Sequence, residues 1–166
     1  MKLPKLVCTD VDGVLTDGGM YYDEKGNELK KFNVADGWGV RFLKDLSIPV
    51  MIITGEDSAC VKKRGEKLKI DFIYTGISNK LEFTLQFCEK HNLTLEDLAF
   101  IGDDLNDLKL LRRVGISGAP GDAPTYVKKE VDIVTETYGG HGAFRAFVET
   151  ILRKNDKLDM LIESFR

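Results

Sequence analysis

Two aspartates separated by one residue, Asp10 and Asp12, are the residues of this sequence best placed to do chemistry. They follow the apolar run 6–8 and precede Gly13, which predicts a buried strand that ends in a turn. Because alternate residues of a strand share one face, both carboxylates can converge on one point. Two such acids either bind a hard cation such as Mg²⁺ or divide the roles of nucleophile and proton donor. A turn in which the aspartates have only a structural role is the alternative.

Polar residues also follow two other apolar runs of the sequence. Thr54 follows the run 50–53, and Asp103 follows the run 98–101. Lys80 stands at the start of a predicted helix. A lysine and a hydroxyl suit phosphate oxygens, and carboxylates suit Mg²⁺. Together these groups are what phosphoryl transfer to a carboxylate nucleophile requires.

The elements that must position these residues alternate between strand and helix. Continuous apolar runs predict buried parallel strands at 6–8, 50–53 and 98–101. Weaker strand candidates lie at 72–74 and 131–134. Helical patterns lie between them: 37–46, 58–68, 80–91, 104–114, 123–129 and 142–153. This alternation predicts an α/β, Rossmann-like three-layer sandwich with a central parallel sheet. Ligands bind beyond the carboxyl ends of such strands, so the polar residues are expected to share one crevice.

One segment, residues 18–32, breaks the alternation and predicts a β-hairpin that projects from the sheet after the first strand. Its apolar residues include Met20, Tyr22 and Phe32. An isolated hairpin is only marginally stable in water, so this one is expected to pack on its own domain or on another subunit. Nothing else interrupts the pattern, and residues 1–166 are expected to form a single domain.

The bulk composition excludes several classes of protein. With a net charge of −3, the chain lacks the basic excess of a nucleic-acid binder. No stretch is long and apolar enough to predict a membrane helix, and the first residues do not resemble a signal peptide. Cys8, Cys60 and Cys88 are odd in number and unclustered, which favours reduced thiols and a cytoplasmic location.

The ordered set of motifs resembles the haloacid dehalogenase superfamily of phosphatases across nearly the whole chain. The set comprises Asp10-Val11-Asp12-Gly13-Val14, then Thr54 after an apolar strand, then Lys80, then residues 102–107. By position, the resemblance implies that Asp10 is the nucleophile and forms an aspartyl-phosphate. It implies that Asp12 is the general acid and then the general base.

The resemblance also implies the metal and phosphate ligands. Mg²⁺ would be bound by the carboxylates of Asp10 and Asp103 and by the backbone carbonyl of Asp12, with Asp104 or Asp107 in the outer shell. Thr54 and Lys80 would hold the phosphoryl oxygens, so the implied catalytic set is Asp10, Asp12, Thr54 and Lys80.

The short intervals between the motifs leave no room for a separate cap domain. This arrangement resembles the capless subfamily that contains 3-deoxy-D-manno-octulosonate (KDO) 8-phosphate phosphatase, whose members are homotetramers that assemble through the hairpin. Local matches around Asp17, Asp36 and the Gly139-Gly140 segment support the resemblance. It implies a phosphorylated sugar acid as substrate, a homotetramer, and a role in surface-sugar biosynthesis.

The residues after Thr54 bear on which sugar acid is used. Gly55 and Glu56 are expected to contact substrate, and Glu56 stands where the KDO 8-phosphate branch usually has arginine. Arg64 and Lys67 share a helix face and are expected to bind a substrate carboxylate, with a solvated charge run as the alternative. The combination of Glu56 and Lys67 looks like the branch that acts on 2-keto-3-deoxynononate 9-phosphate, which is the favoured reading.

Other functions remain open at this stage. The alternatives in substrate are KDO 8-phosphate and N-acylneuraminate 9-phosphate. A non-catalytic assembly domain of the same fold is the alternative of a different class, although all four motifs are intact.

Overall fold

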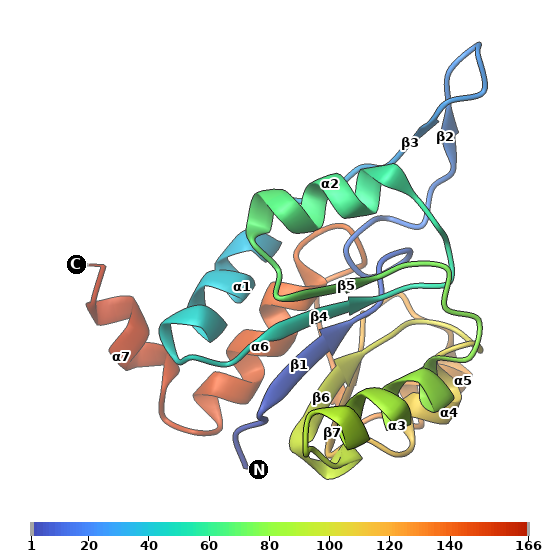
Figure 1. Cartoon of the computed structure of the whole chain (residues 1–166). Helices are drawn as coiled ribbons and strands as arrows, with labels where there is room; N and C mark the ends of the chain where they lie inside the picture. Colours follow the sequence, from blue (N-terminus) through green and yellow to red (C-terminus); the bar gives the residue numbers. More distant parts are fainter. Residues whose placement is uncertain (1, 166) are drawn as a thin grey trace.

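Six parallel strands form the central sheet of the computed structural model, which describes residues 2–165 (Figure 1). Their order across the sheet is β5-β4-β1-β6-β7-β8. The bounds are β1 Leu6–Thr9, β4 Val50–Ile53, β5 Phe72–Tyr74, β6 Leu98–Ile101, β7 Ile116–Ala119 and β8 Ile133–Val134. The chain builds the sheet outward from β1 in both directions. The point where this direction changes, beyond the carboxyl end of β1, is where such sheets bind ligands.

Helices cover both faces of this sheet. Their bounds are α1 Asp36–Asp45, α2 Ala59–Leu68, α3 Lys80–Lys90, α4 Leu108–Leu111, α5 Thr125–Lys128, α6 Ala143–Arg153 and α7 Leu158–Glu163, with a 3-10 turn, η1, at Leu95–Asp97. The side chains of β1 alternate between two buried clusters: Val7 packs with α1, α2, α6 and α7, and Leu6 and Cys8 pack with α3, α4 and α5. The predicted three-layer sandwich is therefore confirmed.

The structure departs from the expected elements in three places. The helix expected over 104–114 is reduced to α4, because the Asp107 carboxylate accepts the backbone N–H groups of Asp103 and Asp104 and holds the preceding residues as a loop. The strand expected over 131–134 is only β8. Strand β7 was not predicted, because its sequence Ile-Ser-Gly-Ala has little β propensity.

No helix among residues 2–165 is long and apolar enough to cross a membrane.

The hairpin is present as predicted and projects from the body beyond the carboxyl ends of the strands (Figure 1). Its strands, β2 Tyr21–Tyr22 and β3 Glu28–Leu29, pair antiparallel, and a bridge between Thr16 and Phe32 closes its base. Several of its apolar side chains are exposed, as in Met20, which is 56% exposed. In the described chain, only this hairpin and α1 lie between β1 and β4, so the site has no cap domain.

Candidate active site

The predicted residues of three strand ends meet in one crevice. A cavity of about 310 Å³ lies beyond the carboxyl ends of β1, β4 and β6. It is lined by Asp10, Asp12, Thr54, Gly55, Glu56 and Asp103, among others. Parallel register aligns the strand ends: Thr9 of β1 lies beside Ile52 of β4 and Ile101 of β6. The sheet thus brings together side chains that are far apart in the sequence.

Lys80, the first residue of α3, contacts Asp10, which lines this crevice. Its side chain is 1% exposed, and its Nζ lies 2.7 Å from Asp10 Oδ1 and 2.6 Å from Asp107 Oδ1. Asn79 caps the helix by accepting the Glu82 N–H, which fixes where α3 begins. Burial lowers the pKa of Lys80, but Asp10 and Asp107 outweigh it and the pKa is raised. The lysine therefore stays charged and offsets the buried carboxylates.

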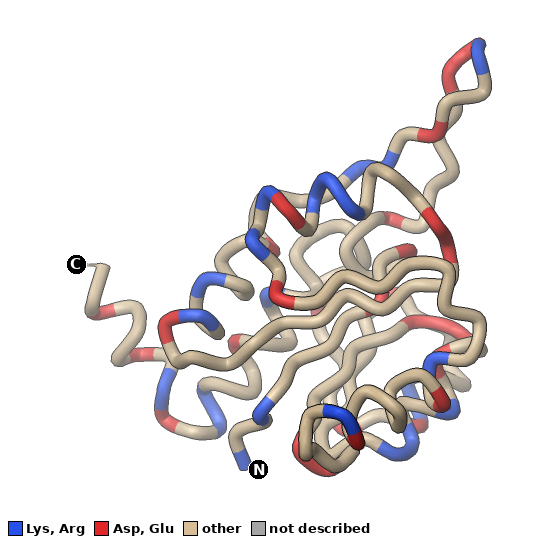
Figure 2. Tube along the Cα trace, in the orientation of Figure 1, with Lys and Arg blue, Asp and Glu red and all other residues tan. Residues whose placement is uncertain are grey.

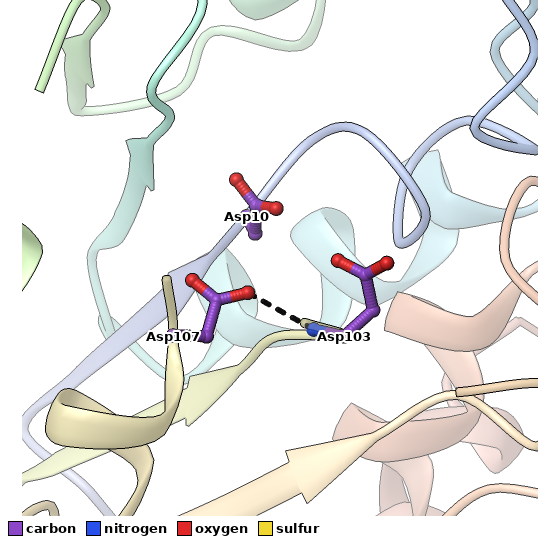
Figure 3. Close-up of side chains that lie close together, drawn as sticks. All are labelled: Asp10, Asp103 and Asp107. Carbon is purple, nitrogen blue, oxygen red and sulfur yellow. Dashed lines mark hydrogen bonds between the residues drawn. The ribbon is translucent and has the colours of Figure 1, made fainter. Parts of the chain in front are cut away.

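Three carboxylates crowd around this lysine. Oxygens of Asp10, Asp103 and Asp107 all lie within 4.8 Å of one another (Figure 3). Burial raises the pKa of Asp10 although Lys80 opposes it, and burial together with the charges of Asp10 and Asp107 raises the pKa of Asp103. One lysine cannot neutralise three clustered acids, two of them buried and the third half-buried. Oxygen ligands with excess negative charge fit a hard divalent cation such as Mg²⁺.

The two candidates for the outer shell differ in the structure. Asp107 is fully buried, and it accepts Lys80 Nζ and the backbone N–H of Asp103 at 3.0 Å. Asp104 is exposed, and its carboxylate accepts the Tyr126 hydroxyl at 3.1 Å. Asp107 therefore orients both Lys80 and Asp103, whereas Asp104 lies at the rim.

Gly13 shows how closely the two catalytic loops approach. It has a φ of +87°, and a Cβ at this position would lie 2.0 Å from Asp103 Oδ2. Only glycine allows both the turn after Asp12 and the neighbouring carboxylate.

Asp12 has a partner that sequence reasoning missed. Lys30, at the end of the hairpin, places its Nζ 2.7 Å from Asp12 Oδ1 and 2.9 Å from Glu28 Oε1. Burial lowers the pKa of Lys30, but the hydrogen bonds to Asp12 and Glu28 outweigh it and raise that pKa. No motif marks this lysine, because the contact depends on how the hairpin leaves and rejoins the body.

The expected substrate-binding residues fall into two groups. Gly55 and Glu56 line the cavity. Arg64 does not line it: its guanidinium donates to the Asn33 carbonyl at 2.8 Å and lies over the Phe32 ring. Lys67 is exposed among the basic residues of α2, which Figure 2 shows as blue segments along that helix. A role for Arg64 or Lys67 in substrate binding therefore requires a rearrangement or a second copy of the chain.

Comparisons with known proteins agree with this geometry. Residues 57–147 match the haloacid dehalogenase-like hydrolase family. The KDO 8-phosphate phosphatase of Haemophilus influenzae is 42% identical over 153 residues, which cover 92% of this chain and 85% of that protein.

Two solved structures are similar over most of the chain. The KDO 8-phosphate phosphatase of Moraxella catarrhalis, in complex with magnesium, phosphate and KDO, superposes with a TM-score of 0.94 at 37% identity and covers 98% of this chain and 94% of that one. The cobalt-bound phosphatase of H. influenzae superposes with a TM-score of 0.88 at 41% identity, over 93% of this chain and 91% of that one.

Proposed function

The chain belongs to the haloacid dehalogenase-like hydrolases, and from that premise we propose that it hydrolyses the phosphate ester of a 2-keto-3-deoxy sugar acid. The observation that carries the proposal is the buried pair of Asp10 and Lys80, with Asp12 and Thr54 lining the same cavity. A buried carboxylate beside one lysine is a nucleophile whose negative charge is offset and whose position is fixed. The intact site argues against a non-catalytic assembly domain.

The proposed reaction has two steps. A carboxylate oxygen of Asp10 attacks phosphorus, the bond from phosphorus to the sugar oxygen breaks, and Asp12 gives its proton to that oxygen. Asp12 then takes a proton from water, whose oxygen attacks the aspartyl-phosphate and releases phosphate and free Asp10. Lys80 and the Thr54 hydroxyl hold phosphoryl oxygens throughout.

Mg²⁺ is the cofactor that the carboxylate cluster fits, and similar phosphatases bind magnesium or cobalt. The carboxylates of Asp10 and Asp103 and the backbone carbonyl of Asp12 would hold it. When bound, it supplies positive charge to the phosphoryl oxygens. Asp107 would not bind the metal directly; it orients Asp103 and Lys80 through its hydrogen bonds to both.

KDO 8-phosphate is the substrate that the relatives support best. The preference for 2-keto-3-deoxynononate 9-phosphate is not confirmed, because the similar proteins act on, or hold, the eight-carbon sugar acid. The nine-carbon acids, including N-acylneuraminate 9-phosphate, remain second candidates because of Glu56. This residue lines the cavity and places a negative charge where the KDO 8-phosphate branch usually has arginine.

A kinetic screen of eight- and nine-carbon sugar-acid phosphates tests both the reaction and the substrate. Asp10→Asn should lower kcat at least about 10⁴-fold on every substrate, because the nucleophile is lost. Phosphate release that survives this change would contradict the mechanism. The highest kcat/KM should be on KDO 8-phosphate. If a nine-carbon ester is preferred, and Glu56→Ala lowers kcat/KM mainly for that ester, the second candidate replaces the first.

We also propose a homotetramer that closes the capless site through the hairpin. The exposed apolar side chains of the hairpin, with Tyr22 60% and Leu29 56% exposed, favour a protein partner. A second subunit would exclude water from the cavity. Light scattering should give four times the mass of the chain, and Tyr22→Glu should reduce it. A monomer at micromolar concentration would contradict this proposal.

A further inference from the structure

Lys30 is a buried lysine on the projecting hairpin. Its side chain is 1% exposed, although the next residue, Lys31, is 59% exposed and pairs with Asp17. Lysine is almost never buried unless its charge is paired, because its ammonium group is strongly hydrated. Two carboxylates pair it here, Asp12 at 2.7 Å and Glu28 at 2.9 Å.

The contact leaves the two oxygens of Asp12 in different states. Oδ1 accepts Lys30 Nζ and also the Thr16 hydroxyl at 3.3 Å. Oδ2 is buried and has no hydrogen-bond partner among residues 2–165. Asp12 itself lines the cavity. Two donors therefore fix the carboxylate through Oδ1, while no donor among these residues binds Oδ2.

The base of the hairpin determines where Lys30 lies. The bridge between Thr16 and Phe32 joins the two ends of the hairpin beside Asp12. Glu28 holds the lysine from the other side, and hydrogen bonds from Lys30 first and Ser58 next lower the pKa of Glu28. Ser58 precedes α2, so the start of α2 contacts Glu28, and Glu28 and Asp12 hold Lys30 between them.

We propose that Lys30 is a positioning residue for the reaction: by binding Asp12 Oδ1 it fixes the orientation of the Asp12 carboxylate at the cavity, where this carboxylate exchanges a proton with the leaving oxygen and with water. This inference rests on the proposed function, because it takes Asp12 as the acid and base. A purely structural ion pair that anchors the hairpin would affect all substrates alike. A positioning role affects most those substrates whose leaving group needs a proton.

Two phosphate esters separate these roles. An alkyl phosphate, either the sugar-acid phosphate or a simpler alkyl ester that the parent hydrolyses, has a leaving oxygen that needs a proton. p-Nitrophenyl phosphate has a leaving group that departs as an anion. In Lys30→Met, kcat/KM should fall about 10- to 100-fold on the alkyl ester, with a much smaller fall on the aryl ester. KM on both should stay near the parent value.

Equal losses on the two esters, or no loss, would overturn the proposal. If Lys30→Met does not fold, Lys30→Gln carries the same criterion, since its shorter, uncharged side chain removes the ammonium group that binds Asp12 Oδ1. Lys30→Arg should restore the ratio of the two rates toward that of the parent. Lys31→Met is the matched control and should leave that ratio unchanged.

The test also separates this inference from the proposed function. Activity that survives Asp10→Asn would refute the proposed function, whatever Lys30 does. A parent enzyme that hydrolyses simple phosphates but no sugar-acid phosphate would refute only the proposed substrate. The ratio of alkyl to aryl rates still decides the role of Lys30 in that case.

Discussion

The two aspartates of the site are each held by a buried lysine, but these lysines come from different regions of the molecule. Lys80 belongs to the body: it begins α3, and its partners Asp10 and Asp107 are 6% and 0% exposed. Lys30 belongs to the hairpin, and its partners Asp12 and Glu28 are 28% and 26% exposed. The same type of contact is thus made once inside the core and once at the rim.

Because their partners differ in exposure, we expect Lys80 to matter mainly for stability and Lys30 mainly for the orientation of Asp12. In the body, the lysine neutralises carboxylates that are almost entirely buried, so losing it leaves buried negative charge uncompensated. At the rim, water screens part of the charge, and the lysine contributes mainly the orientation of one carboxylate. We therefore expect the body of the fold to fix the proposed nucleophile, Asp10, and the hairpin to orient the proposed acid, Asp12.

The largest expected effect is on stability and compares the two lysines directly. Lys80→Met leaves two buried carboxylates without their cation and should lower the free energy of unfolding by about 3–5 kcal/mol. Lys30→Met should lower it by about 1 kcal/mol, because its partners are partly exposed. Urea unfolding at pH 7 without Mg²⁺ measures both. Lys62→Met, at an exposed pair with Asp57, is the control. Equal losses for Lys80 and Lys30 would break the comparison.

The second expected effect is a pH dependence of stability, and it comes from Asp36, the first residue of α1. Asp36 is 2% exposed; its Oδ1 accepts the Arg145 N–H at 3.1 Å, and its Oδ2 has no partner among the described residues. Burial raises the pKa of Asp36 from 3.8 to about 6. The folded state holds this proton more tightly than the unfolded chain. The stability it contributes is complete below about pH 4 and is lost as the pH rises through 6.

Asp36→Asn measures that contribution. Between pH 4 and pH 7 the free energy of unfolding of the parent should fall relative to the variant by about 3 kcal/mol, which corresponds to two pH units of pKa shift. Unfolding curves of both proteins without Mg²⁺ give the difference, and Asp45→Asn, on the exposed part of α1, is the matched control. A difference that does not vary with pH would show that folding does not raise the pKa of Asp36.

Much of the body could be predicted from local sequence. The runs that became β1, β4 and β6 are apolar throughout, and the turn that follows each one carries its polar residue, as Asp10 and Thr54 do. Strand β7 escaped prediction because Gly118 is selected by packing: a Cβ there would lie 2.4 Å from the Phe147 ring. The reason for that glycine lies in α6, which is distant in the sequence.

The contacts at the rim of the site were harder to predict, because they too join residues that are distant in the sequence. The contact between Lys30 and Asp12 joins residues 18 apart across a hairpin whose base is set by tertiary pairing. Arg64 and Lys67 share a helix face as expected, but the structure directs Arg64 to Asn33 and away from the cavity. Periodicity predicts which residues share a face of an element, whereas the orientation of that face depends on packing.

The smallest expected effect compares the two contacts of Lys30, with Asp12 and with Glu28. Glu28→Gln keeps an oxygen near Lys30 but removes the charge on the hairpin side, where the carboxylate is partly exposed. Stability should fall by less than about 1 kcal/mol, and the ratio of alkyl to aryl kcat/KM should change much less than in Lys30→Met. Glu24→Gln, at the exposed turn of the hairpin, is the matched control. If Glu28→Gln changed that ratio as much as Lys30→Met does, Glu28 would be needed to keep Lys30 on Asp12. If only Lys30→Met changes it, the lysine acts toward Asp12, because the hairpin then keeps its other contacts while the acid loses its donor.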